Sequence, residues 1–251
     1  MHINLKDRVA LVTGGSGAIG RIICVYLARA GAGVVGNCSS LDAPSAAQLQ
    51  QDAKANGWDI GLSPFNVGDF DETQIAIQRI EEEYGPIEIL VNAAGITRDA
   101  PIKRMDLNQW QAVMKVNLDS CFNTCRHIAP GMAERGYGRI INISSINGQK
   151  GQFGQVNYSA AKAGMHGLTM ALAQEVARKG VTVNTVSPGY IDSPMIQAVP
   201  EKIREGIQAG IPAGRFGQPR DIAAMVTYLA SEQASFLTGS NIPVNGGQFM
   251  H

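Results

Sequence analysis

The sequence lacks a net charge, because 21 basic side chains balance 21 acidic ones among its 251 residues. A chain without excess positive charge has no overall field to attract DNA, RNA or an anionic membrane, so nucleic acid is a poor candidate partner. The composition is 45% hydrophobic and 17% charged. Those proportions favour a folded, soluble globular protein with a sizeable core over a disordered chain.

Long apolar runs are also missing. A membrane-spanning helix needs about 18 or more consecutive apolar residues, and no such run occurs, so we expect no membrane span. The amino-terminal segment Met1–Arg8 is polar and lacks the apolar region of a secretory signal. We therefore expect the protein to be cytoplasmic.

Cysteines are few and show no metal-binding pattern. Cys24, Cys38, Cys121 and Cys125 include no pair at C-x-x-C spacing and have no nearby histidine at zinc-ligand spacing. Cys121 and Cys125 could share one helix face, but free thiols in a reducing compartment are the better interpretation. We expect no metal site.

Apolar runs rich in Val and Ile alternate with longer segments of helical period. Few hairpin signals appear, and the intervening segments are long enough for crossover helices. This pattern predicts an α/β fold: a doubly wound, seven-stranded parallel sheet of the Rossmann type, forming a single domain over residues 1–251. The expected strands are Arg8–Thr13, Gly33–Asn37, Ile60–Asn66, Ile87–Asn92, Gly138–Ser144, Val181–Ser187 and Asn241–Asn245.

The segment from about 192 to 219 breaks this rhythm. It carries Pro194, Pro200, Pro212 and Pro219 around a short helical pattern near Glu201–Gln208. It follows the sixth strand and so lies at the edge where a doubly wound sheet binds its ligand. A substrate lid is the favoured interpretation, with a plain surface excursion as the alternative.

A glycine-rich turn joins the first strand to the first helix. Gly15, Gly17 and Gly20 give the spacing G-x-G-x-x-G. Such glycines permit a tight turn and let backbone N–H groups approach a pyrophosphate at a helix start. The spacing alone is weak evidence and is compatible with a mere turn, but its strand–turn–helix context indicates a dinucleotide site.

The second strand ends at Asn37, Ser39 and Ser40, where NAD-binding folds usually carry an acidic residue. Uncharged hydroxyls tolerate the extra phosphate of NADP(H), so we expect NADPH/NADP⁺, although no Arg or Lys occupies this strand end. Asn66–Val67 and Asn92–Gly95 follow the third and fourth strands and could line the adenine and ribose. The residues expected here to bind cofactor are Gly14, Ser16, Gly17, Ile19, Gly20, Asn37, Ser39, Ser40, Asn66, Val67, Asn92, Ala93 and Gly95.

The strongest chemical signal is Tyr158 with Lys162, joined by Ser145 at a strand end and by Asn117 upstream. Residues at i and i+4 lie on one helix face, about 5–6 Å apart at Cβ. A nearby ammonium stabilises a phenolate and lowers its pKa toward the range useful for proton transfer to a carbonyl. Tyr-x-x-x-Lys alone arises by chance, but the combination with the glycine loop indicates a reductase.

The motifs resemble those of the short-chain dehydrogenase/reductase family along essentially the whole chain. The glycine loop, Asn92–Gly95, Asn117, Ser145 and the Tyr158/Lys162 pair fall in the family's order, as do Ser187-Pro188-Gly189 and Asn245-Gly246-Gly247. Ala18 and Ala94 depart from its usual Gly and Asn. The resemblance implies these roles: Tyr158 as general acid, Ser145 bonded to the substrate carbonyl, Lys162 on the nicotinamide ribose, Asn117 on a water-linked proton path, and Pro188, Gly189 and Ile191 beside the nicotinamide.

Within the family, segment 142–158 is most similar to bacterial reductases of acetoacetyl-CoA, which implies NADPH-dependent formation of (R)-3-hydroxybutanoyl-CoA, as in polyhydroxybutyrate synthesis. A 3-keto thioester could accept hydrogen bonds from Gln152, Gln155 and Tyr190, and Phe153 could form an apolar wall for a short acyl chain. Alternatively, the glutamines are solvated and Phe153 packs under the lid. With Ser145 and Tyr158, these are the expected substrate residues.

Two other functions stay open. A 3-oxoacyl-[acyl-carrier-protein] reductase shares the chemistry and differs in its carrier, and a non-catalytic nucleotide-binding regulator would keep the fold without turnover. Retention of both Tyr158 and Lys162 disfavours the regulator. The family resemblance further implies a homotetramer.

Overall fold

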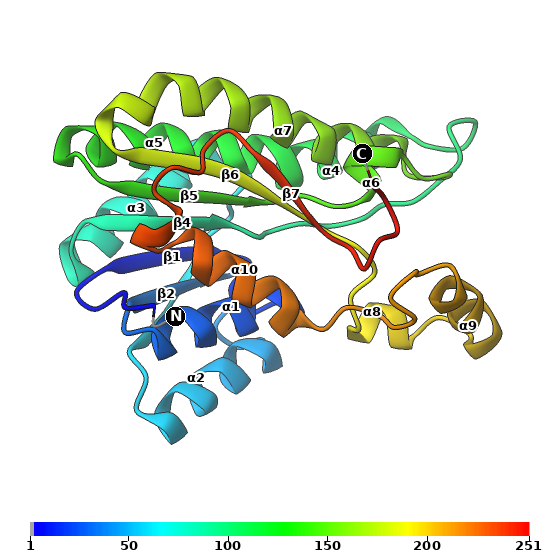
Figure 1. Ribbon diagram of the computed structural model, residues 1–251, viewed down its shortest axis with the longest axis horizontal. Coiled ribbons are helices and arrows are strands. Elements are labelled where there is room, and N and C mark those ends of the chain that lie inside the picture. The colour runs from blue at the N-terminus through cyan, green and yellow to red at the C-terminus, as the bar shows by residue number, and fades with distance from the viewer. Residues whose placement is uncertain (1–2, 251) are drawn as a thin grey trace.

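Short runs rich in Val and Ile form one parallel sheet in the computed structural model, which describes residues 3–250 (Figure 1). The sheet has seven strands in the order β3-β2-β1-β4-β5-β6-β7, and every neighbouring pair is parallel. The predicted doubly wound fold is confirmed. The strands are β1 (Val9–Thr13), β2 (Gly33–Cys38), β3 (Ile60–Pro64), β4 (Ile87–Asn92), β5 (Gly138–Ile143), β6 (Val181–Pro188) and β7 (Asn241–Val244).

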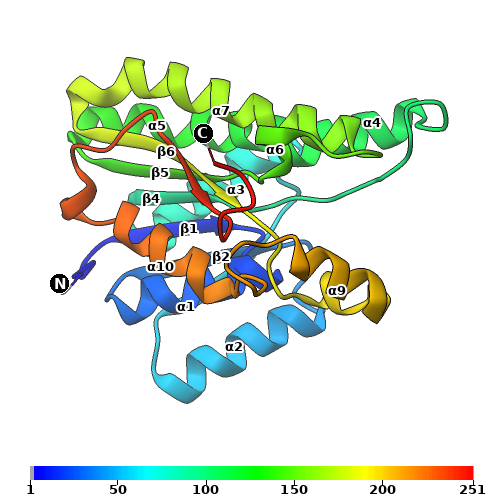
Figure 2. The same ribbon diagram turned by 45° about the vertical axis from the view of Figure 1, so that its right-hand side comes forward.

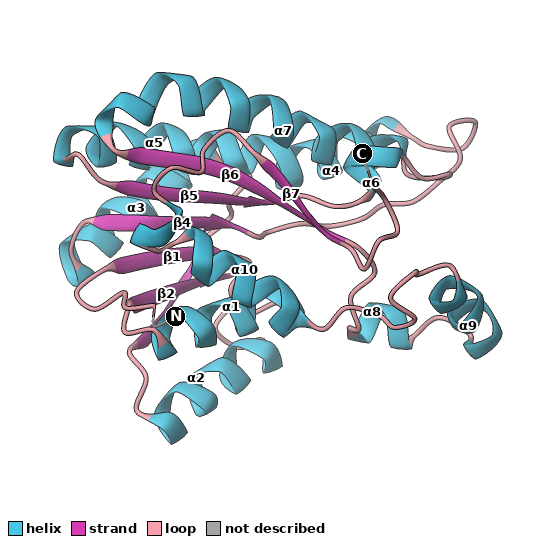
Figure 3. Cartoon of the chain, viewed as in Figure 1, coloured by secondary structure: helices cyan, strands magenta, loops and turns pink. Residues whose placement is uncertain are grey.

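Helices cover both faces of this sheet, as the view coloured by secondary structure shows (Figure 3). The longer ones are α1 (Ala18–Arg29), α2 (Pro44–Asn56), α3 (Phe70–Tyr84), α4 (Leu107–Met114), α5 (Ser120–Arg135), α7 (Val156–Val176), α9 (Glu201–Ala209) and α10 (Pro219–Leu229). Shorter turns are α6 (Asn147–Lys150), α8 (Pro194–Gln197), η1 (Lys115–Asp119), η2 (Ala177–Lys179) and η3 (Glu232–Ala234). None of the helices described is long and apolar enough to cross a bilayer.

The core consists of two apolar layers, one on each side of the sheet. Ala10 and Val12 of β1 face the layer formed with α1 and α10, whereas Leu11 between them faces the layer formed with α3, α5 and α7. Successive strand residues point to opposite faces, so a strand covered on both sides must be apolar throughout. This double burial explains why the strands appear in the sequence as continuous Val and Ile runs.

The chain reverses direction across the sheet between β1 and β4. These strands are neighbours, but β1 leads through α1 to β2 on one side and β4 leads to β5 on the other. Loops after such a pair diverge to opposite faces and leave a crevice at their carboxyl ends. The glycine-rich turn after β1 therefore lies beside the loop that follows β4.

Residues 192–219 fold beside the end of the sheet (Figure 2). The segment contains α8 and α9, and it has its own small apolar cluster of Ile196, Ile211 and Phe216. Both of its ends are fastened together, because Ile191 and Gly217 form a parallel bridge and Asp192 N donates to Gly217 O at 2.7 Å. The helical pattern expected near Glu201–Gln208 is confirmed as α9.

Buried polar side chains connect the middle of the sheet to helices α5 and α7. Asn92 Nδ2 donates to Asn142 Oδ1 at 2.9 Å, and Asn142 Nδ2 donates to Thr169 Oγ1 at 2.9 Å. Thr169 contacts Thr185 at 2.7 Å, and Thr124 donates to Asn92 Oδ1 at 2.8 Å. These bonds join β4, β5, β6, α5 and α7 in one network.

Replacing the central member of this network should destabilise the protein. Asn142→Leu removes the acceptor of the buried Asn92 amide and one of the two partners of the Thr169 hydroxyl, which costs about 2–4 kcal/mol of unfolding free energy. Urea-induced unfolding measures the loss. Asn56→Leu on the exposed face of α2 is the control and should cost less than about 1 kcal/mol. Equal losses for the two variants would contradict the role of the network.

Candidate active site

A cavity of about 480 Å³ lies at the carboxyl ends of the central strands. Its wall combines the glycine turn, the loops after β4, β5 and β6, the start of α7, and α8. Its lining residues are Gly14, Gly17, Ala18, Ile19, Gly20, Ala93, Gly95, Ile96, Thr97, Ile143, Ser144, Ser145, Ile146, Asn147, Gln155, Tyr158, Lys162, Pro188, Gly189, Tyr190, Ile191, Ser193, Pro194 and Ile196.

The glycine turn is packed so tightly that side chains would not fit. Gly14 has φ of +62°, which favours glycine, and a Cβ on Gly20 would lie only 2.2 Å from Gly14 O. Gly17 is the N-cap of α1 and supplies no side-chain cap. The first N–H groups of a helix have no partner within it, so the residues that open α1 present free donors at the cavity wall.

Asn37 holds this turn in place. Its Oδ1 accepts from Gly14 N at 3.1 Å, and its Nδ2 donates to Phe65 O at 2.9 Å. Both ends of the amide are therefore bonded inside the protein, outside the cavity lining. Ser39 and Ser40 follow on the surface with exposed side chains. Arg21, the nearest basic side chain at the start of α1, pairs with Asp52 of α2.

Several other residues expected to bind cofactor also lie outside the cavity lining. Asn66 Oδ1 accepts from Gly68 N at 3.1 Å in the turn before α3, and Val67 is buried with its carbonyl bonded to Asn123. Asn92 belongs to the polar network within the sheet. Ser16 lies within the glycine turn but does not contribute to the lining. The structure thus brings together only part of the predicted set.

Tyr158, Lys162 and Ser145 all line the cavity. Lys162 Nζ donates to Ile143 O at 2.8 Å and lies 5.7 Å from the centre of the Tyr158 ring. Ser145 is the second residue after β5, and Tyr158 and Lys162 occupy successive turns of α7. The predicted strand end and helix face therefore converge.

Asn117 lies behind this group, fully buried. Its Oδ1 accepts from Ile96 N at 2.8 Å, and its Nδ2 donates to Ile96 O at 2.9 Å. Asn117 belongs to the π-helical turn η1, and such wide turns are frequent at functional sites. A Cβ on Gly95 would lie 3.5 Å from both Asn117 Oδ1 and Lys162 Nζ, so Gly95 lies next to both groups.

The residues expected to contact substrate separate into two groups. Gln155 and Tyr190 line the cavity, whereas Gln152 and Phe153 stand on an exposed turn, with Phe153 86% exposed. Gln155 is held from both sides: Asn147 Nδ2 donates to its Oε1 and its Nε2 donates to Asp99 Oδ2, each at 2.8 Å. The expectation that Phe153 forms an apolar wall therefore finds no support in the cavity lining.

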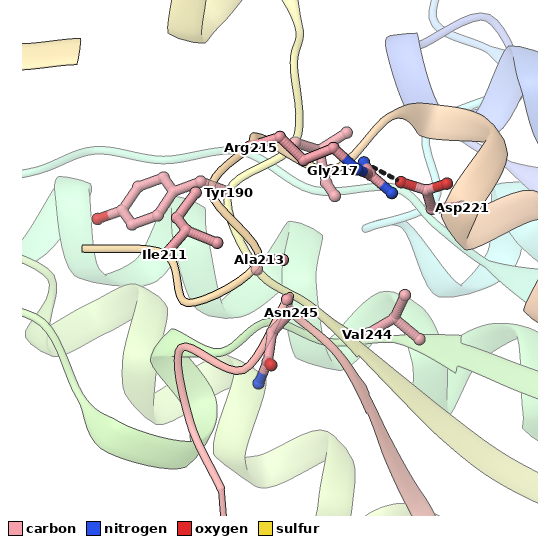
Figure 4. A pocket seen from close by; sticks show the side chains of 11 residues that line it. Tyr190, Ile211, Ala213, Arg215, Gly217, Asp221, Val244 and Asn245 are labelled. Atoms are coloured by element: carbon pink, nitrogen blue, oxygen red, sulfur yellow. Dashed lines mark hydrogen bonds and ion pairs between the residues drawn. The ribbon is translucent and has the colours of Figure 1, made fainter. Parts of the chain in front are cut away.

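A second cavity of about 120 Å³ adjoins the loop after β6 (Figure 4). Tyr190, Ile211 and Asn245 are among its lining residues, and Arg215 pairs with Asp221 at 2.7 Å at its edge. Gly189, Tyr190 and Ile191 line both cavities, so this loop is the partition between them. Among the described residues, no cluster of His, Cys, Asp or Glu could hold a metal ion.

Comparison with known proteins identifies the family. A family model of short chain dehydrogenases matches residues 8–204. The chain belongs to the short-chain dehydrogenase family. The resemblance inferred from the motifs is confirmed.

Relatives within this family match along the full chain. Acetoacetyl-CoA reductase of Allochromatium vinosum is 54% identical, over 97% of this chain and 99% of the relative. Acetoacetyl-CoA reductase of Cupriavidus necator is 49% identical, over 98% and 100%. A 3-oxoacyl-[acyl-carrier-protein] reductase of Vibrio cholerae is 44% identical, over 99% and 100%.

Among solved structures, a putative gluconate dehydrogenase from Agrobacterium tumefaciens superposes with a TM-score of 0.94 at 34% identity. The match covers 99% of this chain and 98% of that one. The seven-stranded arrangement is therefore that of the short-chain dehydrogenases.

Membership of the short-chain dehydrogenases implies a nicotinamide cofactor, and the glycine turn fits one. The uncapped start of α1 offers N–H donors to an anionic pyrophosphate. Gly17 lines the cavity, and a Cβ there would lie only 3.2 Å from Gly14 O, so the turn favours a bare backbone that a cofactor can approach closely. The glycine turn therefore combines N–H donors, the positive end of the helix dipole and a backbone that a pyrophosphate can approach closely.

Burial controls the titration of both principal groups. It raises the pKa of Tyr158 above its usual value of 10, with the Asp99 charge adding to the rise and a hydrogen bond from Ser145 opposing it. Burial lowers the pKa of Lys162 from 10.5 to about 8. The sequence predicts that Lys162 lowers the Tyr158 pKa, but the net shift is upward because desolvation of the phenolate dominates.

Sequence analysis missed Asp99 and Asn147, which hold Gln155, and also Ile96, Ser193 and Ile196 in the cavity wall. Asp99 and Gln155 are 56 positions apart, so no local pattern connects them. The proline-rich segment after β6 was the one available signal for Ser193 and Ile196.

The buried Lys162 should produce a pH-dependent stability term. Between pH 8 and about 10.4 the unfolded chain keeps the lysine proton and the folded protein releases it, so stability rises with pH in that window. The unfolding free energy of the wild type minus that of Lys162→Met should therefore increase from pH 8 to pH 10. Urea unfolding at pH 7, 8, 9 and 10 measures it, and a flat difference contradicts the shift.

Proposed function

We propose that the chain is a reductase that uses NADPH to convert acetoacetyl-CoA to (R)-3-hydroxybutanoyl-CoA. The observation that carries this proposal is the presence of Ser145, Tyr158 and Lys162 in the wall of one cavity that also includes the glycine turn. Full-length similarity to acetoacetyl-CoA reductases at 49–54% identity supports the choice of substrate.

The raised pKa of Tyr158 suits the direction of reduction, because the hydroxyl keeps its proton at neutral pH and can give it to an oxyanion. A bound reduced nicotinamide supplies the hydride that the ketone carbon accepts. Ser145 and Tyr158 hydrogen-bond the ketone oxygen as its negative charge develops, and this charge makes their contribution larger in the transition state than in the bound ketone. Tyr158 then transfers its proton to that oxygen.

Lys162 and Asn117 return a proton to Tyr158 after each reduction. Lys162, with a pKa of about 8, can hold and release a proton near neutral pH. Its Nζ and Asn117 Oδ1 both lie beside Gly95. We assign Asn117 to a water-linked proton path that ends at Lys162. Lys162 also serves to hold the nicotinamide ribose, with Pro188, Gly189 and Ile191 beside the nicotinamide ring.

The choice of NADPH rests on the end of β2. No carboxylate stands among Asn37, Ser39 and Ser40 to repel a 2′-phosphate, and the two serine hydroxyls are exposed to receive it. Asn37 acts indirectly by holding Gly14. The turns at Asn66–Val67 and at Asn92–Ala93 border the adenine and ribose in this proposal.

For the substrate, Gln155 and Tyr190 are the cavity-lining groups that would bond the thioester. Gln152 and Phe153 stand on the exposed turn that precedes Gln155, where the arm of a CoA ester would leave the cavity. Residues 192–219 then act as the substrate lid of a single catalytic domain over residues 1–251.

We also infer a homotetramer and a cytoplasmic site of action. Phe122 on α5 and Met170 on α7 are more than half exposed, which is the kind of apolar surface that a second copy covers. All four cysteines are free and buried, which suits a reducing compartment.

Removing the Tyr158 hydroxyl tests the mechanism. Tyr158→Phe should lower kcat by about 10²–10⁴-fold, because the proton donor is lost while the cavity keeps its shape. NADPH oxidation at 340 nm measures the rate, and fluorescence titration should give a NADPH Kd close to that of the wild type. Tyr228→Phe on α10, outside the cavity lining, is the matched control. Comparable turnover by both variants would refute the assignment.

The carrier is tested by direct competition between substrates. We expect kcat/KM for acetoacetyl-CoA with NADPH to exceed that for acetoacetyl-acyl carrier protein by at least about tenfold, and NADH to be the poorer reductant. A preference for the carrier protein would instead identify a 3-oxoacyl-[acyl-carrier-protein] reductase, the activity of the Vibrio cholerae relative.

A further inference from the structure

His166 lies on α7 one turn beyond Lys162, where it contacts two strand ends at once. Its Nε2 is 3.0 Å from Ser144 Oγ and 3.4 Å from Ser187 Oγ. Ser144 immediately follows β5 and precedes Ser145, while Ser187 lies near the end of β6 and precedes Pro188. One imidazole therefore links the helix of Tyr158 to both loops that form the reaction centre.

The position of the imidazole proton follows from the hydrogen bonds of Ser144. A serine hydroxyl has one proton, and Ser144 Oγ lies 2.8 Å from the carbonyl oxygen of Lys162, which can only accept. That proton is committed to Lys162 O. The contact between Ser144 and His166 is a hydrogen bond only if Nε2 carries the proton and donates it. Ser187 Oγ, bonded to Asn241 Oδ1 at 2.7 Å, is a second acceptor for the same N–H.

The bonds that His166 orients are those that hold Lys162. Ser144 Oγ binds the Lys162 backbone carbonyl, and Lys162 Nζ binds Ile143 O. The lysine is thus attached to the end of β5 by its main chain and its side chain together. Burial and then the Lys162 charge lower the pKa of His166 below its usual value, so near pH 7 the ring is neutral and has one proton to place.

We propose that His166 is a positioning residue for carbonyl reduction, whose Nε2–H fixes the Ser144 hydroxyl and thereby sets the distance from Ser145 to Tyr158 and Lys162. The inference rests on the proposed reductase function. His166 does not line the cavity, so it acts through Ser144 rather than on the substrate.

Two substitutions at position 166 separate the hydrogen bond from the volume of the ring. His166→Leu fills similar space without a donor and should lower kcat roughly tenfold, with KM and the NADPH Kd changed less than about twofold, because small displacements of reacting groups cost rate more than binding. His166→Gln places an amide N–H near Nε2 and should restore kcat to within about threefold of the wild type. His127→Leu on α5 is the matched control, because its ring packs on Phe70 outside the cavity lining.

The kinetic outcomes are decisive in either direction. Wild-type kcat in His166→Leu, or a glutamine variant as slow as the leucine variant, overturns the proposal. A leucine variant whose KM and NADPH Kd rise in step with the loss of kcat also overturns it, since general damage to the fold would do the same.

A second test uses the unmodified protein and does not depend on its activity. Solid-state ¹⁵N NMR of the histidine-labelled wild type, with the His166 signals assigned by difference from His166→Gln, should show Nε2 protonated and Nδ1 unprotonated at pH 8. A proton on Nδ1 alone would overturn the proposal even if the leucine variant failed to fold. If the wild type did not reduce acetoacetyl-CoA but had Nε2 protonated, the proposed substrate would be wrong. The hydrogen bond from His166 to Ser144 would still be supported.

Discussion

The attachment of α7 to the end of β5 is the constraint on which the proposed reaction centre depends. A buried ammonium is costly unless it is hydrogen-bonded, and Lys162 meets that requirement by donating to Ile143 O. Ser144 binds the backbone of the same residue. A Cβ on Gly148 of α6 would lie 2.8 Å from the Lys162 carbonyl carbon, so even a methyl group there would push α6 and α7 apart. Strand and helix are held in one geometry by contacts that converge on one lysine.

That attachment has electrostatic consequences. Burial lowers the pKa of Lys162 to about 8, and burial also raises the pKa of Tyr158. A phenol that stays protonated and an amine that exchanges its proton near neutral pH are complementary partners for proton delivery. The polar network of Asn92, Asn142 and Thr169 lies directly beneath and connects the central strands to α7. Rigidity in that layer is what keeps donor positions fixed at the cavity wall.

Much of this arrangement could be predicted from the sequence, for physical reasons. Strands buried on both faces must be apolar, and helix geometry places Tyr158 and Lys162 on one face, so the seven strands and the pair at the centre were both predictable. The roles of residues that bond to a neighbouring strand were not predictable, because the sequence does not show which strands lie side by side. Asn37 bonds Gly14 across two strands, and Asn92 turns into the sheet rather than toward the cavity. The Tyr158 shift was predicted with the wrong sign, because spacing reports the neighbouring charge and not the burial.

The proposed reaction requires a ketone oxygen to bind between Ser145 and Tyr158 in the 480 Å³ cavity. The most direct test is a crystal structure of the Tyr158→Phe variant with acetoacetyl-CoA, which should bind without turning over. The proposed binding mode places the 3-keto oxygen within hydrogen-bonding distance of Ser145 Oγ and beside the ring at position 158, with the thioester near Gln155. An acetoacetyl group bound in the smaller cavity beside Asn245, or outside both cavities, would contradict it.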